Sequence, residues 1–303
     1  MEKTCIIIVG PTAVGKTSLA IRVAEYLGTE IISCDSRQCY REMSIGVAKP
    51  SDEELQQVKH HFINSHSIHE DVNAAVFEQY ALGAVKEIFS RHNVAVMVGG
   101  TGLYVKAFCE GMDSMPAIAP EIRKQIIEGY EQQGLFWLQQ QVADNDPLYY
   151  NTGEIQNPQR LMRALEVKLA TGQSIRQYQQ GKKVQRDFRV VKIGLELPKE
   201  TLHDNINQRV QIMMQQGLLE EVKGLLPWRQ LNALQTVGYT ELFNYLDGTS
   251  SLNAAVEFIQ RNTRQYAKRQ MTWFRKSADI QWFSPKNEAV IIDHCQHVVR
   301  GLL

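Results

Sequence analysis

The segment GPTAVGKT, residues 10–17, has the spacing G-x-x-x-x-G-K-[ST] and follows a short apolar run directly. In this pattern the glycines let successive backbone N–H groups turn inward on phosphate oxygens, and the start of the following helix adds positive potential. Lys16 would neutralise phosphate charge, and the Thr17 hydroxyl would hold Mg²⁺. The segment predicts a site for phosphate or diphosphate; the alternative is a glycine turn with a chance lysine.

An acidic residue near this loop has two interpretations. A nucleotide-hydrolysing enzyme would need an apolar strand that ends in a Mg²⁺-organising Asp, but the run 94–98 ends in GGTG, residues 99–102. The run 31–34 ends in Asp35, yet it lies so close to the loop that we expect it to be the strand after the first helix. Asp35 could there act as a general base beside the phosphates; the alternative is the N-cap of the next helix.

Half of the eight histidines lie between residues 60 and 69, which raises the question of a metal site. Zinc enzymes commonly place two His on one helical turn with a Glu between them, and that spacing is absent here. We therefore expect packing and surface roles for these histidines.

Residues 261–276 carry six basic side chains, no acidic ones, and interleaved aromatic rings. Backbone phosphates and stacked bases would suit such a stripe, so nucleic acid and a plain basic surface helix both remain open. Arg160 and Arg163 form a second basic pair one helical turn apart, for which a salt-bridged surface turn is the alternative. Together the two patches favour a polyanionic partner.

These residues must be positioned by alternating strands and helices. Short apolar runs at 5–9, 30–34 and 94–98 predict buried strands, and helical periodicity follows at 17–27 and 103–109. This alternation predicts an α/β fold with a parallel sheet. Ligands of such sheets bind beyond the carboxyl ends of the strands, where all three polar turns would meet.

The composition changes after Pro116: residues 121 to about 186 are rich in Gln, Arg and Glu and show no pattern typical of a strand. Strand character returns at 189–197, helical periodicity at 201–226, and a long basic helix at about 253–276. We expect a P-loop α/β core, first part, at 1–116, a helical insertion at 117–187, and the second part of the core at 188–303.

Composition limits the class of protein. The 303 residues include 33 basic and 33 acidic side chains, so a nucleic-acid contact must come from local charge. Five scattered cysteines with no C-x-x-C pair argue against a disulfide framework or structural zinc, and no apolar run approaches the roughly 18 residues of a membrane span. We expect a cytoplasmic, monomeric protein that does not enter a membrane.

With these motifs in place, nearly the whole chain resembles the tRNA dimethylallyltransferases (tRNA isopentenyltransferases) of bacterial type. The resemblance is carried by the following segments: GPTAVGKT at 10–17, DSRQ at 35–38, IG at 45–46 with AKP at 48–50, HH at 60–61, GGTGLY at 99–104, QR at 159–160 with RALEV at 163–167, VGY at 237–239, and YAKRQ at 266–270 with TWFR at 272–275. Several separate motifs in one order make coincidence negligible.

The resemblance implies transfer of a dimethylallyl group from its diphosphate to the exocyclic amine of the adenosine immediately 3′ of the tRNA anticodon. The phosphate loop would then hold a diphosphate leaving group, which explains the missing acidic strand end. The implied diphosphate ligands, with Mg²⁺ on Thr17, are Gly10, Thr12, Ala13, Val14, Gly15, Lys16, Thr17 and Arg209. Asp35 would be the general base, and Thr101 would contact the same nucleotide.

The same resemblance implies that the anticodon stem-loop contacts both the core and the insertion. The implied tRNA-binding residues are Asp35, Ser36, Arg37, Gln38, Thr101, Arg123, Gln159, Arg160, Leu161, Met162, Arg163, Arg264, Lys268 and Arg269. Two other functions compete with this interpretation. A P-loop nucleoside or small-molecule kinase would leave the basic helix without a role, and a non-catalytic RNA-binding module would leave the phosphate loop unexplained.

Overall fold

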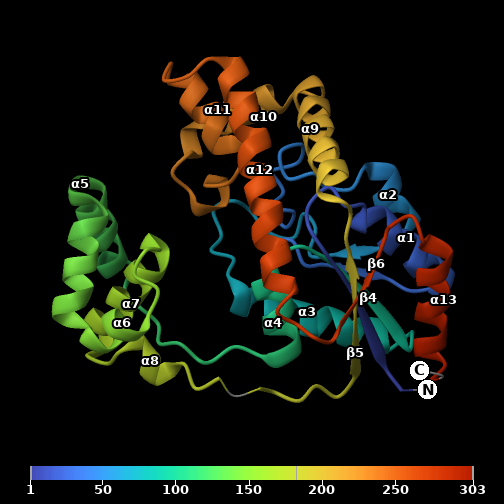
Figure 1. The fold of residues 1–303 in the computed structure, drawn as a ribbon. Helices are drawn as coiled ribbons and strands as arrows, with labels where there is room; N and C mark the ends of the chain where they lie inside the picture. Colours follow the sequence, from blue (N-terminus) through green and yellow to red (C-terminus); the bar gives the residue numbers. More distant parts are fainter. Residues whose placement is uncertain (1, 182, 302–303) are drawn as a thin grey trace. The chain divides into compact units, whose positions relative to one another are not determined.

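A computed structural model describes residues 2–181 and 183–301, which form two compact units (Figure 1). One unit contains the residues up to Glu110 and those from Gln185 onward, and the other is Gly111–Val184. The helical insertion was predicted at 117–187. The second unit begins earlier because Met115 packs against its apolar core.

In the described part of the chain, the first unit contains one sheet of six parallel strands in the order β3-β2-β4-β1-β5-β6. The strands are β1 (Thr4–Val9), β2 (Ile31–Ser33), β3 (His60–His61), β4 (Val94–Gly99), β5 (Arg189–Leu195) and β6 (Ile280–Phe283). The predicted α/β class and the four longer runs are confirmed. The two edge strands, β3 and β6, gave no sequence signal because they are short and only partly apolar.

Helices cover both faces of this sheet. They are needed on both because successive apolar side chains of β1 point to opposite faces. Cys5 and Ile7 face one apolar core, whereas Ile6 and Ile8 face the other. The helices of this unit are α1 (Lys16–Leu27), α2 (Asp52–Gln57), α3 (Ala74–Phe89), α4 (Gly102–Glu110), α9 (Lys199–Gln215), α10 (Leu218–Leu225), α11 (Tyr239–Leu246), α12 (Leu252–Phe274) and α13 (Glu288–Val299), with short 3₁₀ turns at Leu226–Trp228 and Asn232–Leu234.

Helical periodicity was predicted at 201–226, and the structure has two helices there, α9 and α10. Gly217 adopts a φ of 99° between α9 and α10, a left-handed conformation that ends the first helix. This break turns α10 so that Leu218 and Val222 join the core of the first unit.

The second unit is entirely helical in its described residues and has its own core. Its helices are α5 (Pro120–Asn145), α6 (Pro147–Thr152), α7 (Pro158–Thr171) and α8 (Ile175–Tyr178). Gly134, with a φ of 76°, interrupts α5. Leu138 and Leu165 are fully enclosed between α5 and α7, so this segment folds around its own apolar cluster.

A search of the described helices for a membrane span found none of sufficient length and apolar character.

Candidate active site

The loop between β1 and α1 has the backbone shape of a phosphate cradle. Gly10, Ala13 and Gly15 have φ values of 146°, 63° and 97°. A Cβ on Gly10 would lie 2.6 Å from the carbonyl oxygen of Leu195, so only glycine fits this close approach to β5. Among the residues that the structure describes, no side chain caps the start of α1 at Gly15, which leaves the first N–H groups of the helix for an anion.

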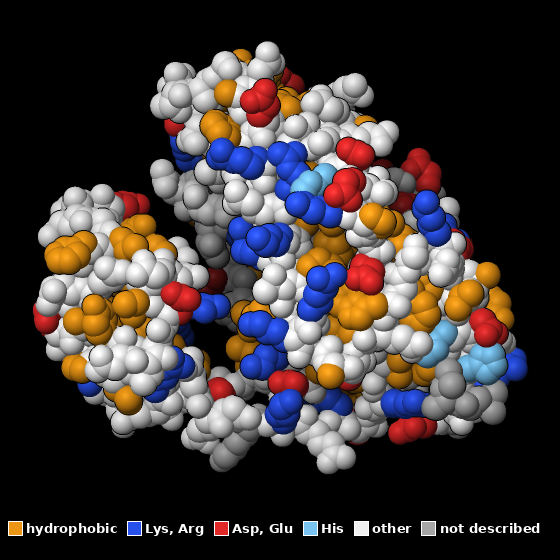
Figure 2. Space-filling view, in the orientation of Figure 1, with side chains coloured by type: hydrophobic (Ala, Val, Ile, Leu, Met, Phe, Trp, Pro, Cys, Tyr) orange, Lys and Arg blue, Asp and Glu red, His pale blue; other side chains and the backbone are white. Residues whose placement is uncertain are grey.

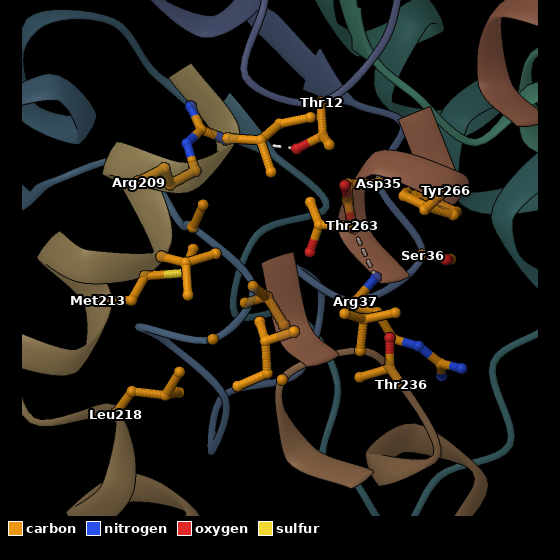
Figure 3. Close-up of a pocket in the computed structure, with 18 residues that line it drawn as sticks. Thr12, Asp35, Ser36, Arg37, Arg209, Met213, Leu218, Thr236, Thr263 and Tyr266 are labelled. Atoms are coloured by element: carbon orange, nitrogen blue, oxygen red, sulfur yellow. Dashed lines mark hydrogen bonds between the residues drawn. The ribbon is translucent and has the colours of Figure 1, made fainter. Parts of the chain in front are cut away.

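Two cationic side chains lie at this loop. Lys16 donates from Nζ to the carbonyl of Pro11 at 2.6 Å, and Arg209 on α9 donates to the Thr12 hydroxyl at 3.4 Å (Figure 3). Burial and then the Arg209 charge lower the pKa of Lys16 to about 8, against the opposing effect of Asp35. Burial also lowers the pKa of Arg209. A bound polyanion would relieve this repulsion between two cations.

Asp35 follows β2 and is held by its own turn. Its Oδ1 accepts hydrogen bonds from the backbone N–H groups of Arg37 at 2.9 Å and Gln38 at 3.3 Å (Figure 3). The alternative that Asp35 caps a helix is wrong, because residues 36–39 form a turn. Within the described residues, Oδ2 has no hydrogen-bond partner, so one oxygen of this carboxylate can still accept a proton.

Thr101 and Tyr266 lie beside this turn. The Thr101 hydroxyl accepts a hydrogen bond from the Ser36 N–H at 3.2 Å. Burial, followed by the Asp35 charge, raises the pKa of Tyr266 to about 12. Tyr266 therefore remains a neutral hydroxyl next to Asp35 at neutral pH.

Gln270 on α12 is a site residue that the sequence analysis missed. Its Oε1 accepts from the Thr12 N–H at 2.8 Å, and its Nε2 donates to the Gly100 carbonyl at 3.0 Å. Gln270 is a neutral residue within a run of basic ones, so its residue type did not suggest a role in binding or catalysis. Two signals could have found it: Gln270 ends the motif YAKRQ at 266–270, and its spacing of four from Tyr266 places both side chains on the same face of α12.

A cavity of about 220 Å³ lies next to Asp35 (Figure 3). Its polar lining residues are Thr12, Asp35, Ser36, Arg37, Arg209, Thr236, Thr263 and Tyr266, and its apolar ones are Val47, Ala48, Ile206, Val210, Met213, Leu218, Val237 and Ile259. A second cavity of about 80 Å³ connects the same carboxylate with Lys16, Thr17 and Gln270. A large groove of about 1000 Å³ runs over the phosphate loop, along Ala13–Ser18 and Arg209.

The long basic helix was predicted at about 253–276 and is α12. Its buried side includes Ile259, Ala267 and Phe274, so the charged residues point outward, and Figure 2 shows Lys and Arg side chains along its course. Lys268 and Arg269 are exposed, and the Arg269 guanidinium lies 5.8 Å from the ring centroid of Tyr266. Arg264 instead donates to Asn207 Oδ1 at 2.6 Å and is half-buried.

The insertion residues assigned to tRNA do not share one environment. Gln159 and Arg160 are exposed at the start of α7. Leu161 and Met162 are buried in the core of their unit, with 0% and 3% exposure. Their assignment as tRNA contacts is therefore corrected: an amphipathic helix must turn these apolar side chains inward.

Arg123 and Arg163 converge on one buried carboxylate. They donate to the two oxygens of Glu166 at 2.9 Å and 3.2 Å, while the Glu166 side chain is 1% exposed. Arg163 thus fits the salt-bridged turn considered above. Both guanidinium groups remain partly exposed beyond this ion pair.

The histidine-rich segment has packing contacts. His61 Nε2 lies 2.7 Å from a Glu30 oxygen, and His60 Nδ1 lies 2.8 Å from the Val58 carbonyl. The His66 ring packs against Phe62, with ring centroids 5.4 Å apart.

Comparison with known proteins gives a consistent family. A family model described as IPP transferase matches residues 38–277. A tRNA dimethylallyltransferase of Christiangramia forsetii is 47% identical over 98% of both chains, and one of Flavobacterium psychrophilum is 48% identical over 93% of this chain and 94% of that one.

Two solved structures agree in fold with this chain. A tRNA isopentenylpyrophosphate transferase of Bacillus halodurans has a TM-score of 0.73 at 34% identity, covering 99% of this chain and 98% of that one. A eukaryotic dimethylallyltransferase acting on tRNA has a TM-score of 0.74 at 25% identity, covering 93% and 73%. The phosphate loop, the Asp35 turn and α12 all line one set of neighbouring cavities. Together with this geometry, the matches show that the chain belongs to the tRNA dimethylallyltransferase family.

Proposed function

We propose that this protein transfers a dimethylallyl group from dimethylallyl diphosphate to the exocyclic N6 amine of the adenosine immediately 3′ of the tRNA anticodon, releasing diphosphate. The observation that carries this proposal is that Asp35 lines both the mostly apolar cavity and the smaller cavity at Lys16. An allylic diphosphate has an apolar chain and a charged end, and these neighbouring cavities match the two parts.

The phosphate loop would hold the leaving group. The residues for this role are Gly10, Thr12, Ala13, Val14, Gly15, Lys16, Thr17 and Arg209. As the carbon–oxygen bond of the donor breaks, negative charge grows on the diphosphate, and fixed N–H groups and buried cations stabilise that charge. Lys16 and Arg209 are supported in this role by their burial at the loop, which lowers the pKa of both side chains.

Asp35 would act on the nucleophile. Its Oδ2 accepts the amine proton or orients the amine, while the bonds to Oδ1 keep the carboxylate in place. Thr101, which accepts a hydrogen bond from the Ser36 N–H, would contact the same nucleotide. The adenine must leave its stack to reach this position.

Mg²⁺ fits the donor set of the smaller cavity, where the oxygen atoms of Thr17, Ser33 and Asp35 are hard ligands. The Thr17 hydroxyl and the diphosphate would hold the ion. When bound, it would neutralise part of the diphosphate charge.

The tRNA would lie along the exposed basic residues of α12. Lys268 and Arg269 suit backbone phosphates, and Tyr266 offers an aromatic ring next to Asp35. Further contacts are proposed for Ser36, Arg37, Gln38, Arg264 and, in the insertion, Arg123, Gln159, Arg160 and Arg163. The protein would act as a cytoplasmic monomer.

The competing function is a P-loop kinase. The family match favours the transferase, since the relatives named above are tRNA dimethylallyltransferases. The test is to incubate the purified protein with Mg²⁺, radiolabelled dimethylallyl diphosphate and unmodified tRNA that carries adenosine beside the anticodon, with a labelled-ATP assay in parallel. Label in the tRNA without ATP is the expected result. Consumption of ATP without label transfer would establish the kinase instead.

A further inference from the structure

One carboxylate behind the apolar cavity gathers four hydrogen bonds. Glu221 on α10 accepts from the backbone N–H groups of Ser44 at 3.0 Å, Ile45 at 2.8 Å and Gly46 at 3.0 Å. Its Oε1 also accepts from the Tyr239 hydroxyl at 2.6 Å. Three consecutive N–H groups of the loop at residues 44–48 donate to this one carboxylate. They fix the path of the loop, because a hydrogen bond to a charged acceptor is stronger than one to a neutral acceptor.

The Tyr239 ring fixes the same loop from the side. Tyr239 is fully buried, and a Cβ on Gly46 would lie 2.5 to 2.8 Å from its ring atoms. Burial and then the Glu221 charge raise the pKa of Tyr239, so its hydroxyl remains a donor to the carboxylate. The Tyr239 ring and the Glu221 carboxylate thus both restrict the position of the loop.

This loop forms a wall of the cavity beside Asp35. Gly46, Val47 and Ala48 line the cavity, as does Leu218 on the first turn of α10. Glu221 itself does not line the cavity and acts from behind the wall. On its other side the loop accepts hydrogen bonds from Gln38 Nε2, at 3.3 Å to the Val47 carbonyl and 2.9 Å to the Ala48 carbonyl.

We propose that Glu221 is a positioning residue that sets the width of the apolar cavity and thereby restricts the donor to a short, five-carbon allylic diphosphate. The inference rests on the proposed function, because it takes the cavity as the site of the donor chain. With the wall fixed by four bonds, a ten-carbon chain cannot push the loop aside. A loosened wall admits the longer chain and holds the short chain less well.

The variant Glu221→Gln tests this with little change of volume. A glutamine has one acceptor oxygen, and its NH₂ group would face N–H donors of the loop, so the wall loses its fixed position. Glu220→Gln is the matched control: Glu220 is the preceding residue, its side chain is 73% exposed, and it pairs with Lys223. Tyr239→Phe removes one of the four bonds and keeps the ring.

The experiment gives each protein equal concentrations of dimethylallyl and geranyl diphosphate with tRNA and measures the ratio of the two products. For Glu221→Gln we expect the geranyl share to rise about tenfold, with a raised KM for dimethylallyl diphosphate, in the range by which an apolar pocket discriminates chain length. We expect a smaller rise for Tyr239→Phe and none for Glu220→Gln. A product ratio is independent of the fraction of active protein, so partial unfolding does not imitate this result.

The outcomes separate the two proposals. A wild-type protein that transfers neither chain overturns the proposed function. Transfer by the wild type, with an unchanged product ratio in Glu221→Gln, overturns the role of Glu221 alone. If Glu221→Gln does not fold, an unchanged ratio in Tyr239→Phe overturns it.

Discussion

The side chain of Gln270 accepts a hydrogen bond from the backbone N–H of Thr12 at 2.8 Å and is 6% exposed. The same side chain donates to the Gly100 carbonyl, so α12 fastens the phosphate loop to the polar turn after β4. One helix thus presents basic residues on its outer face and holds the phosphate loop with its inner face. Gln270 thus links the helix proposed to bind tRNA to the loop proposed to hold the donor.

The first prediction concerns this connection. Gln270→Ala removes the partner of the partly buried Thr12 N–H and of the buried Gly100 carbonyl, and an unsatisfied buried group costs about 1–3 kcal/mol. We expect the free energy of unfolding to fall by at least this amount and the KM for the donor to rise, measured by denaturant titration and steady-state kinetics. Gln265→Ala, at an exposed position of α12, is the control. Equal behaviour of the two variants would contradict the role of Gln270.

The second prediction is a pH dependence of donor binding. Since the pKa of Lys16 is lowered to about 8, this residue loses its charge as the pH rises through 8 in the protein without donor. We expect donor affinity to fall above this pH and binding at pH 9 to take up a proton, measured by calorimetry in buffers of different ionisation enthalpy. Arg209→Gln removes the neighbouring positive charge and should move this decline to higher pH; an unmoved decline would exclude the coupling of the two cations.

The lowered pKa of Lys16 also affects the free energy of unfolding. The unfolded chain keeps the ordinary Lys pKa of 10.5 and so binds more protons than the folded chain between pH 8 and 10.5. The contribution of Lys16 should therefore make the protein without donor more stable as the pH rises from about 8 to 10.5. Lys16→Met should remove this contribution to the pH dependence of the unfolding free energy.

The third prediction concerns Asp35. Asp35→Asn keeps an acceptor oxygen for the N–H groups of Arg37 and Gln38, so the turn remains while the base is lost. We expect kcat to fall by about 10²- to 10⁴-fold, the usual contribution of a general base, with tRNA affinity unchanged. Single-turnover transfer and filter binding measure the two quantities. Full turnover by this variant would remove Asp35 as the base.

The fourth prediction concerns the exposed basic residues of α12. Replacing both Lys268 and Arg269 by Gln removes two candidate phosphate contacts. The slope of log affinity for tRNA against log salt should therefore decrease in magnitude by about 1.4 to 1.8. Lys86→Gln, on the exposed side of α3, serves as the control. An unaltered slope in the double variant would exclude this helix from the tRNA interface.

Much of the fold follows from local patterns in the sequence. The runs at β1 and β4 are continuous and apolar because their strands are buried, and Gly28 ends α1 in a left-handed conformation. Local patterns failed for the edge strand β3, which is too short to show a period of two. A motif also assigned Leu161 and Met162 to tRNA binding, but the packing of their helix turns both side chains inward.

By itself, the sequence determined the phosphate loop, the parallel α/β core and the basic helix, because each depends on spacing within a few turns or on a continuous apolar run. Only the tertiary structure decided which distant groups complete the site. Gln270 meets Thr12 across 258 positions, and Glu221 meets Gly46 across 175. Such contacts depend on how helices pack against the sheet, and a local pattern does not indicate which distant residue each side chain will meet.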